Sequence, residues 1–342
     1  QLRKTVLQIG SDGAKVIAPR LLNGTQYGLL CPIHSPDGGN TGLHKHLSTS
    51  THITNGVASK PYINYLRMLD MLLLEECSLD LISISTKIFL NGAWIGISIK
   101  PIELVKTIKL HRRNNIIYIY TSVLFDIKRN EIQIWVDAGR PCRPLFYIEN
   151  EIPSFSPEII KQKLKNNKLS WKELVCGFDA EYNTFGILDI QSNIKPTEHL
   201  EKNKAIIDYI DASEGEGMKL ARSDNIATEN NTHMEIHPSL ILGFMANQII
   251  FPENNPYPRN AFSCGQSKQG VSVYHSNFKN RIDKSAFILN YGQTPLTKSR
   301  YLKHLTKEEQ PYGENVIVAV MCYSGYNVED AIIINKGSIE RG

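Results

Sequence analysis

Residues 86–98 have the sequence TKIFLNGAWIGIS, and this stretch indicates the fold class. Two short apolar runs, rich in residues that favour strands, lie on either side of Asn91 and Gly92. Asn and Gly accept the positive φ angles that a tight two-residue turn requires. The stretch therefore predicts a β-hairpin.

The flanking segments mix helix and strand patterns. Residues 101–115 carry apolar side chains at helical spacing, whereas 116–126 and 131–139 alternate as paired strands do. We also expect a helix over 64–76 and a strand-rich segment over 316–335. Together these patterns predict an α+β protein with several domains.

The composition is that of an ordinary folded protein. The 342 residues are 42% hydrophobic and 21% charged, which leaves room for two or three domains with real cores. The net charge of +4 is too small to indicate a nucleic-acid partner by itself. However, nine Lys/Arg against three Asp/Glu fall between residues 259 and 309, which makes that stretch electropositive.

The cysteines and the apolar runs indicate the cellular environment that suits the protein. The six cysteines include no CxxC pair, which argues against a zinc ribbon or a disulfide framework and favours reduced thiols in an intracellular protein. No apolar run approaches the ~18 residues of a membrane span, and no signal peptide is recognisable at the N-terminus. Because the chain begins with Gln1 and stops just after a strand-like run, we expect it to be an internal fragment.

The common catalytic motifs are missing from the sequence: GxSxG, a Walker A loop, HExxH and GxGxxG. His233, Glu235 and His237 alternate and would share one face of a strand, which is a conceivable metal site. Pro238 follows directly and no further ligand lies nearby, so a hydrogen-bonded structural cluster is the favoured interpretation. The acidic stretch 211–219, DASEGEGMK, is expected to be a solvated loop.

Residues 255–271, NPYPRNAFSCGQSKQGV, are the most informative stretch. Arg259 offers a bidentate fork to phosphate oxygens, Lys268 a point charge, and Gln269 a donor and an acceptor. Phe262 is the aromatic residue among them. A nucleotide-binding segment and a solvated basic loop both fit this pattern.

A pair of acids, Glu329 and Asp330, ends the stretch MCYSGYNVED at 321–330. The pair follows a Gly-Tyr-Asn turn and precedes an apolar run. Such a pair either belongs to a site for a cation or phosphates or forms a solvated loop end, and the local sequence fits both.

Several of these motifs together resemble the hybrid-binding region of the second-largest (beta) subunit of multisubunit DNA-directed RNA polymerases, in its eukaryotic and archaeal form. They are YPRN, SKQ, PLTKSR and CYSGYNVEDAIIINKGSIERG. CPIHSPDGGNTGLHKHLS is similar to the fork segment of that subunit, and NGAWIG and DAGRPCRPLF are similar to its external domains. HMEIHPSLILG resembles the entry to hybrid binding.

The resemblance implies a domain plan. It comprises a fork region at 1–80, a first external module at 81–160, a second external module with the acidic loop at 161–232, and the first part of a hybrid-binding domain, with a β-rich barrel portion, at 233–342. The implied activity is template-directed RNA synthesis from nucleoside triphosphates by two-metal phosphoryl transfer, carried out only by the multisubunit complex.

The resemblance also implies roles for single residues. Arg259 would reach the triphosphate, and Lys268 with Gln269 would lie along the RNA 3′ end and the RNA–DNA hybrid. Glu329 and Asp330 would help to hold a Mg²⁺ ion shared with the largest subunit. Further implied partners are other polymerase subunits, the DNA template and the RNA transcript, with no zinc in this stretch and no membrane.

The fork residues and the departures from the family complete the picture. Arg20 would lie near the downstream DNA, and Asp37 would face the catalytic subunit. His34-Ser35-Pro36-Asp37 stands where the family commonly has Glu-Thr-Pro-Glu, and Phe262 replaces a frequent Tyr, so it could stack without donating a hydroxyl hydrogen bond. Some departures resemble the polymerases of large eukaryotic DNA viruses, which implies work in the nucleus or, for a viral enzyme, in the host cytoplasm or virion.

Two rival functions belong to other classes. A non-catalytic nucleic-acid-binding or assembly protein with a polymerase-subunit-like fold would tolerate neutral residues at Arg259 and Asp330, and both charges are present here. A metal-dependent enzyme centred on His233, Glu235 and His237 would carry a bound transition metal.

Overall fold

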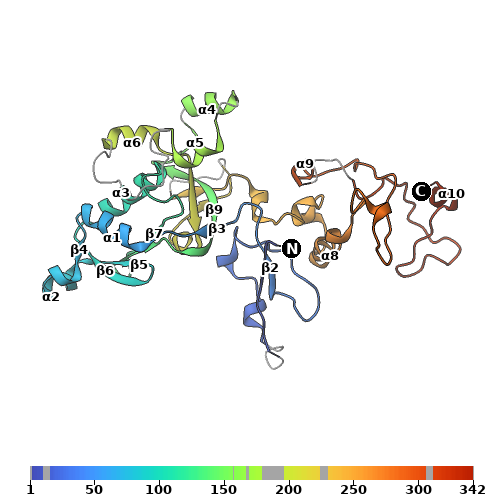
Figure 1. Cartoon of the computed structure of the whole chain (residues 1–342), viewed down its shortest axis with the longest axis horizontal. Helices are drawn as coiled ribbons and strands as arrows, with labels where there is room; N and C mark the ends of the chain where they lie inside the picture. The colour runs from blue at the N-terminus through green and yellow to red at the C-terminus, as the bar shows by residue number, and fades with distance from the viewer. Residues whose placement is uncertain are drawn as a thin grey trace. The chain divides into compact units, whose positions relative to one another are not determined.

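The computed structural model describes residues 2–10, 16–156, 158–166, 169–178, 196–223, 230–305 and 311–341. The chain forms two compact units, each built from separate parts of the sequence (Figure 1). Unit 1 contains residues 1–22, 31–47 and 242–342, and unit 2 contains 23–30 and 48–241. Helices and strands are mixed in the chain, which confirms the α+β class.

The first sheet of unit 2 has five strands in the order β4-β6-β5-β8-β7. Its bounds are β4 Leu72–Leu73, β5 Thr86–Leu90, β6 Ala93–Ser98, β7 Ser122–Asp126 and β8 Glu131–Trp135. The predicted hairpin is confirmed as β5 and β6, which pair antiparallel from Thr86↔Ser98 to Leu90↔Ala93. Its turn residues have the expected positive φ, 49° at Asn91 and 82° at Gly92.

Two helices, α1 Ser59–Met68 and α3 Pro101–Arg113, pack their apolar side chains into one core with this sheet. Leu66 and Ile108 contribute from the helices, and Ile88, Ile132 and Ile134 contribute from β5 and β8. The pattern at 101–115 therefore correctly predicted α3. The helix expected over 64–76 was wrong in its bounds, because Asp70 adopts φ of 62° and ends α1, and the chain continues into β4.

The second sheet of unit 2 is built around β9 Ala138–Glu149, the long strand visible in Figure 1. Antiparallel partners of β9 are β3 His52–Asn55, β10 Ile152–Pro153, β11 Ile207–Asp211 and β13 His233–Met234. Parallel to β13 runs β12 Leu220–Ala221. The described residues of unit 2 also form the α-helices α2 Leu79–Ile84, α4 Glu158–Lys165, α5 Trp171–Cys176, α6 Thr197–Asn203 and α7 Ala212–Glu216.

Unit 1 has little regular structure. Its strands β1 Lys4–Val6 and β2 His44–His46 pair antiparallel, and α8 Tyr257–Gln266 is its longest helix. Shorter helices follow at α9 Leu302–Leu305 and α10 Lys336–Glu340. Asp12 and Gly13, a residue pair typical of a tight turn, lie outside the described residues.

The strand-rich prediction for 316–335 was wrong for this structure. These residues form no ladder with any described part of the chain, and Ile317, Val320 and Ile332 are largely exposed. A strand needs a hydrogen-bonding neighbour as well as β-branched residues. The barrel portion implied for 233–342 therefore stays a prediction.

Two further features of the structure concern its cysteines and the hydropathy of its helices. All six cysteines are free, and Cys31, Cys142 and Cys264 are buried. Among the described residues, no helix is both long and apolar enough to cross a membrane.

The core of the first sheet yields a stability prediction. We expect Ile134→Ala to lower the unfolding free energy of unit 2 by about 2–5 kcal/mol, because it leaves a cavity between the sheet and its helices. Ile127, which is 78% exposed in the β7–β8 turn, provides the control, since Ile127→Ala should change that energy by less than about 0.5 kcal/mol. Native-state hydrogen exchange of β5 and β8 amides in the full-length protein measures both. Equal losses would contradict the assignment of this core.

Candidate functional site

Helix α8 presents the basic residues of the 255–271 stretch. Pro256 precedes the helix, and Asn260 on its buried face donates from Nδ2 to the carbonyl of Pro252 at 2.7 Å. One turn later Cys264 packs with Cys31 and Ala246 in a small apolar core. The sequence left open a solvated basic loop here, but residues 257–266 are helical. Proline is compatible with the first turn of a helix, and that is where Pro258 lies.

Arg259 is exposed on the face of α8 that Asn260 and Cys264 leave free. Its guanidinium carbon lies 5.7 Å from the centre of the Phe262 ring, which is within cation–π range. The structure therefore brings together two of the predicted residues, and no carboxylate of the described part of the chain pairs with the Arg259 guanidinium.

Lys268 lies in a 3-10 turn, Ser267–Gln269, directly after α8, with Gln269 exposed beside it. Partial burial and the charge of Lys4 lower the pKa of Lys268. Its ammonium group acts in turn on two histidines of unit 1, His34 and His46. Lys268 is thus part of a cationic cluster with Lys4, which the sequence did not indicate.

His34 and His46 stack on each other, with ring centres 3.5 Å apart and planes within 1°. Both are buried, His34 in a loop and His46 at the end of β2. Burial, followed by the neighbouring His46 and Lys268, lowers the pKa of His34 to about 3. Burial and Lys268 lower that of His46 to about 4. Both rings are therefore neutral at pH 7, because burial disfavours their charged forms and Lys268 repels a further positive charge.

The acid pair Glu329 and Asp330 is exposed on a loop. The side chain of Asn327 closes this loop by donating to the carbonyl of Met321 at 2.6 Å and accepting from the amide of Tyr323 at 3.1 Å. Glu329 has φ of 54°, so its backbone is in the left-handed region. No contact joins either acid to Arg259 or Lys268 among the described residues, and no group of three or more His, Cys, Asp or Glu there could hold a metal ion.

Arg20 ties two loops of unit 1 together. Its Nη1 donates to the carbonyls of Gly39 and Thr41 at 2.7 and 2.9 Å, and Nε donates to that of Val16 at 3.2 Å. Asp37 is exposed at the bend of the loop that Arg20 holds. Arg20 thus holds the backbone just after Asp37, which links the two predicted fork residues.

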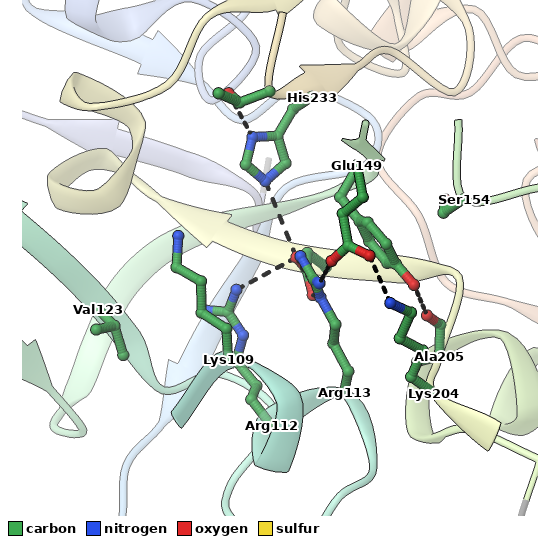
Figure 2. Close-up of polar contacts among 12 residues, drawn as sticks. Lys109, Arg112, Arg113, Val123, Glu149, Ser154, Lys204, Ala205 and His233 are labelled. Atoms are coloured by element: carbon green, nitrogen blue, oxygen red, sulfur yellow. Dashed lines mark hydrogen bonds and ion pairs between the residues drawn. The ribbon is translucent and has the colours of Figure 1, made fainter. Parts of the chain in front are cut away.

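A buried ionic network, which the sequence did not predict, lies in unit 2 at the C-terminal end of α3 (Figure 2). Arg112 is fully enclosed, and its Nη1 and Nη2 donate to the two carboxylate oxygens of Glu214 at 2.6 and 3.2 Å. Nη1 also donates to the carbonyl of Thr121 at 2.7 Å. The two-pronged geometry suits a guanidinium paired with a carboxylate.

Arg113 forms the second half of the network. Its Nε and Nη2 donate to Asp208 at 3.0 and 2.7 Å, while Nη1 bonds to Glu149, whose other oxygen accepts from Lys204 at 2.5 Å. The guanidinium carbon also lies 3.5 Å from the centre of the Tyr147 ring. In Figure 2 the carboxylate of Glu149 lies between Arg113 and Lys204. Arg113 therefore joins α3 to β9 and β11.

The network determines the charge states of its acids. Burial alone would favour the neutral carboxyl groups, but Arg112 and Lys109 lower the pKa of Glu214 to about 2. Arg113 and Arg112 likewise hold the pKa of Asp208 well below its usual range, against the effect of burial. Both carboxylates are thus ionised and paired at neutral pH.

The solvated-loop prediction for 211–219 was wrong for its first residues. These form the short helix α7, Asp211 accepts the amide of Glu214 at 2.9 Å, and Glu214 points inward to Arg112. The cause is a buried cation about a hundred positions earlier, which a local pattern of acids and glycines does not show. Part of the acidic stretch that follows, residues 224–229, lies outside the described residues.

His233, Glu235 and His237 have separate structural partners. His233 is buried next to Asp208, with 3.9 Å between Nε2 and the nearer carboxylate oxygen, and Glu235 accepts from Arg143 at 2.6 Å. His237 bonds to the hydroxyl of Ser239 at 2.6 Å. These contacts agree with the hydrogen-bonded structural interpretation.

Three protein-family models match the chain. They describe domains 3, 4 and 6 of RNA polymerase Rpb2 and match residues 3–53, 88–149 and 245–342, respectively. The third match contains α8 and the loop with Glu329 and Asp330, and the first contains Arg20 and Asp37.

Curated relatives match over the whole chain. It is 37% identical to the DNA-directed RNA polymerase II subunit RPB2 of Encephalitozoon cuniculi, 36% to RNA polymerase II subunit 2 of Arabidopsis thaliana and 34% to subunit Rpo2 of Sulfolobus acidocaldarius. Each alignment covers 100% of this chain but only 28%, 28% and 29% of the relative. The chain thus spans less than a third of the length of these relatives.

The buried network predicts a large effect from a small change. We expect Glu214→Gln to lower the unfolding free energy of unit 2 by about 3–5 kcal/mol, because it leaves the buried Arg112 charge without its counter-ion. Glu216→Gln is the matched control, since Glu216 is exposed on the same helix. Denaturant unfolding followed by hydrogen exchange on β7 and β11 measures the difference. Similar stability of the two variants would refute the role assigned to Glu214.

The stacked histidines predict a pH dependence for unit 1. Their folded pKa values of about 3 and 4 lie below the ordinary 6.5, so the unfolded chain takes up protons first as the pH falls. Their contribution to stability is complete above pH 6.5 and declines from pH 6.5 towards pH 4. Hydrogen exchange of β1 and β2 amides across this range should show the decline, and His34→Phe should make it shallower. His44→Asn, on the same strand as His46, is the control, and an unchanged slope in His34→Phe would contradict this account.

Proposed function

Because this chain belongs to the family of second-largest subunits of multisubunit RNA polymerases, we propose that it works as part of a DNA-directed RNA polymerase. In this proposal the complex synthesises RNA on a DNA template by two-metal phosphoryl transfer, and this chain contributes contacts to the incoming nucleotide and to the RNA–DNA hybrid. Phosphoryl transfer depends mainly on positioning and on stabilisation of negative charge. Fixed cations are therefore the contribution to look for in this chain.

The observation that carries the proposal is the way α8 holds Arg259. The buried side of the helix is fixed through Asn260 and Cys264, so the opposite side presents a guanidinium from a rigid element. Arg259 would bind the triphosphate of the incoming nucleotide, with Phe262 supporting its guanidinium from one face. Rigid support of this kind reduces the entropy lost when a charged group binds.

Lys268 and Gln269 would bind the RNA 3′ end and the hybrid. Both follow α8 directly, and Lys4 adds a second positive charge near Lys268. His34 and His46 are neutral, so they add no positive charge that would favour loss of a proton from Lys268. Lys268 would therefore meet a phosphate as an ammonium ion.

The acid pair offers the type of ligand that a shared magnesium site would need. Glu329 and Asp330 offer exposed carboxylate oxygens, which Mg²⁺ prefers, but two side chains cannot complete its coordination. In this proposal the largest subunit supplies the remaining ligands. The ion would neutralise charge on the phosphates of the nucleotide, and this chain would provide the acid pair on the loop closed by Asn327.

The fork residues would contribute to the interface with the largest subunit. Arg20 would stabilise the loop that carries Asp37, and Asp37 would face the largest subunit from the exposed bend. The partners in this proposal are the other polymerase subunits, the DNA template, the transcript and the nucleoside triphosphates. The complex would work in the nucleus or, if the chain is viral, in the host cytoplasm or virion.

Nucleotide addition on a preformed RNA–DNA scaffold tests the proposal, using the assembled complex with the full-length subunit. A lost charge-assisted contact costs about 1.5–3 kcal/mol, so we expect Arg259→Ala to reduce nucleotide use by roughly ten- to a hundredfold. Scaffold binding should be nearly unchanged, because the lost contact is to the triphosphate.

Lys284→Ala is the matched control, since Lys284 is an exposed cation of the same unit outside α8. Its nucleotide use should equal that of the wild type. If Arg259→Ala also behaves as the wild type, Arg259 has no part in the chemistry, and a non-catalytic nucleic-acid-binding or assembly role becomes the better account.

A further inference from the structure

A cleft of about 540 Å³ lies in unit 2, and none of its lining residues is one of those proposed above for nucleotide or hybrid contacts. Its walls come from the 23–30 segment, from β9 and β11, and from the chain around α7. The volume is within the range of roughly 300–1,000 Å³ in which proteins bind small molecules.

Arg143 of β9 lines this cleft with a nearly enclosed side chain, only 4% exposed. Its Nη1 donates to Glu235 at 2.6 Å, whereas its Nη2 is buried and finds no acceptor among the described residues. A shielded guanidinium N–H without an acceptor is costly. Because Nη2 has almost no exposed surface, an oxygen in the cleft would reach it only when a neighbouring wall side chain moves aside, such as Tyr27, whose ring centre lies 5.4 Å from the guanidinium carbon.

The backbone at Gly28 is fitted closely around this arginine. A Cβ atom added there would lie 2.2 Å from the guanidinium carbon of Arg143, and the φ of +74° at Gly28 also favours glycine. The 23–30 segment thus passes directly over the guanidinium. This close passage fixes the position of Arg143 in the wall of the cleft.

The rest of the cleft is mixed in character. Arg222 and the ring of Tyr27 are exposed at the cleft, and both Arg143 and Arg222 act electrostatically on the Tyr27 hydroxyl. Apolar side chains supply much of the remaining lining, namely Leu29, Ile210, Met218 and Leu220. Tyr27 and Arg222 can change rotamer as a ligand enters, because neither belongs to the core.

We propose that this cleft binds a small organic monocarboxylate, with its carboxylate accepting from Arg143 and its apolar body lying on the aliphatic wall. A single carboxylate matches the unpartnered Nη2 of Arg143 and the additional charge of Arg222. The surrounding charge is balanced, because Glu235 already neutralises Arg143, Asp211 is paired with Arg140, and Glu216 is a further acid at the cleft. A phosphate dianion would meet that acid without enough cations to compensate.

Saturation-transfer difference NMR tests this proposal with 3-phenylpropionate as the probe and the purified polymerase complex containing the full-length subunit as the receptor. We expect the probe to bind. Its neutral amide, 3-phenylpropanamide, and the dianion phenyl phosphate should bind at least about tenfold more weakly, because the amide has no charge for Arg222 to attract and the dianion is repelled by Glu216.

Three variants locate the binding. Arg143→Lys keeps the charge towards Glu235 but removes the free nitrogen, so it should weaken binding by more than about tenfold. Arg222→Gln changes an exposed side chain that makes no ion pair with a described residue, and it should weaken binding about threefold. Arg129→Gln, an exposed arginine in the β7–β8 turn of the same unit, should bind as the wild type.

Four results would overturn the proposal. They are no binding of 3-phenylpropionate by the wild type, unchanged binding in Arg222→Gln, unchanged binding in a folded Arg143→Lys variant, and equal binding of the amide. Equal or tighter binding of phenyl phosphate would refute the assignment to carboxylates. If Arg143→Lys does not fold, Arg222→Gln and the amide comparison still decide the question.

Discussion

Two adjacent arginines at the end of α3 are the constraint on which unit 2 depends. The apolar face of α3 belongs to the core of the five-stranded sheet, through Leu104 and Ile108. In its last turn, Arg112 pairs with Glu214 of α7, and Arg113 pairs with Asp208 of β11, a strand of the second sheet. Charges removed from water must be paired, and breaking such a pair is more costly than never having formed it. These ion pairs therefore fix the position of the first sheet and its helices relative to the second sheet of unit 2, because movement would separate buried charges.

Unit 1 uses burial for a different purpose. Asn260 and Cys264 fix one side of α8, and the stacked His34 and His46 occupy the interior near Lys268 without adding charge. In unit 2 Arg112 and Arg113 are enclosed and serve the fold, whereas in unit 1 the buried His34 and His46 are neutral and Arg259 remains exposed. This contrast separates arginines that stabilise the protein from those available to a ligand. Sequence composition cannot make that distinction, because both kinds are simply basic residues.

Local patterns predicted the parts of the fold that local interactions determine. Asn91 and Gly92 specified a turn, and the spacing within 101–115 specified a helix. The long strand β9 was missed because Pro141 and Pro144 argue against a central strand, yet four other strands pair with it. The inward turn of Glu214 and the absence of a ladder at 316–335 depend on partners far away in the sequence or lacking among the described residues. For the site, Arg259 and Phe262 were recognisable from residue type, but the contribution of Lys4 beside Lys268 required the fold.

The interleaving of the two units in the sequence has a consequence for biosynthesis. Cys31 belongs to a small core that also needs Ala246 and Cys264, whereas almost all of unit 2 lies between them in the chain. A ribosome that delivers the chain from its N-terminus supplies every strand of unit 2 before it supplies α8. Unit 2 can then complete its ion pairs while the first parts of unit 1 still wait for their partners. During that interval a nascent chain exposes the apolar surface around Cys31, which makes the timing of synthesis, and the chaperones that attend it, part of how this fold is reached.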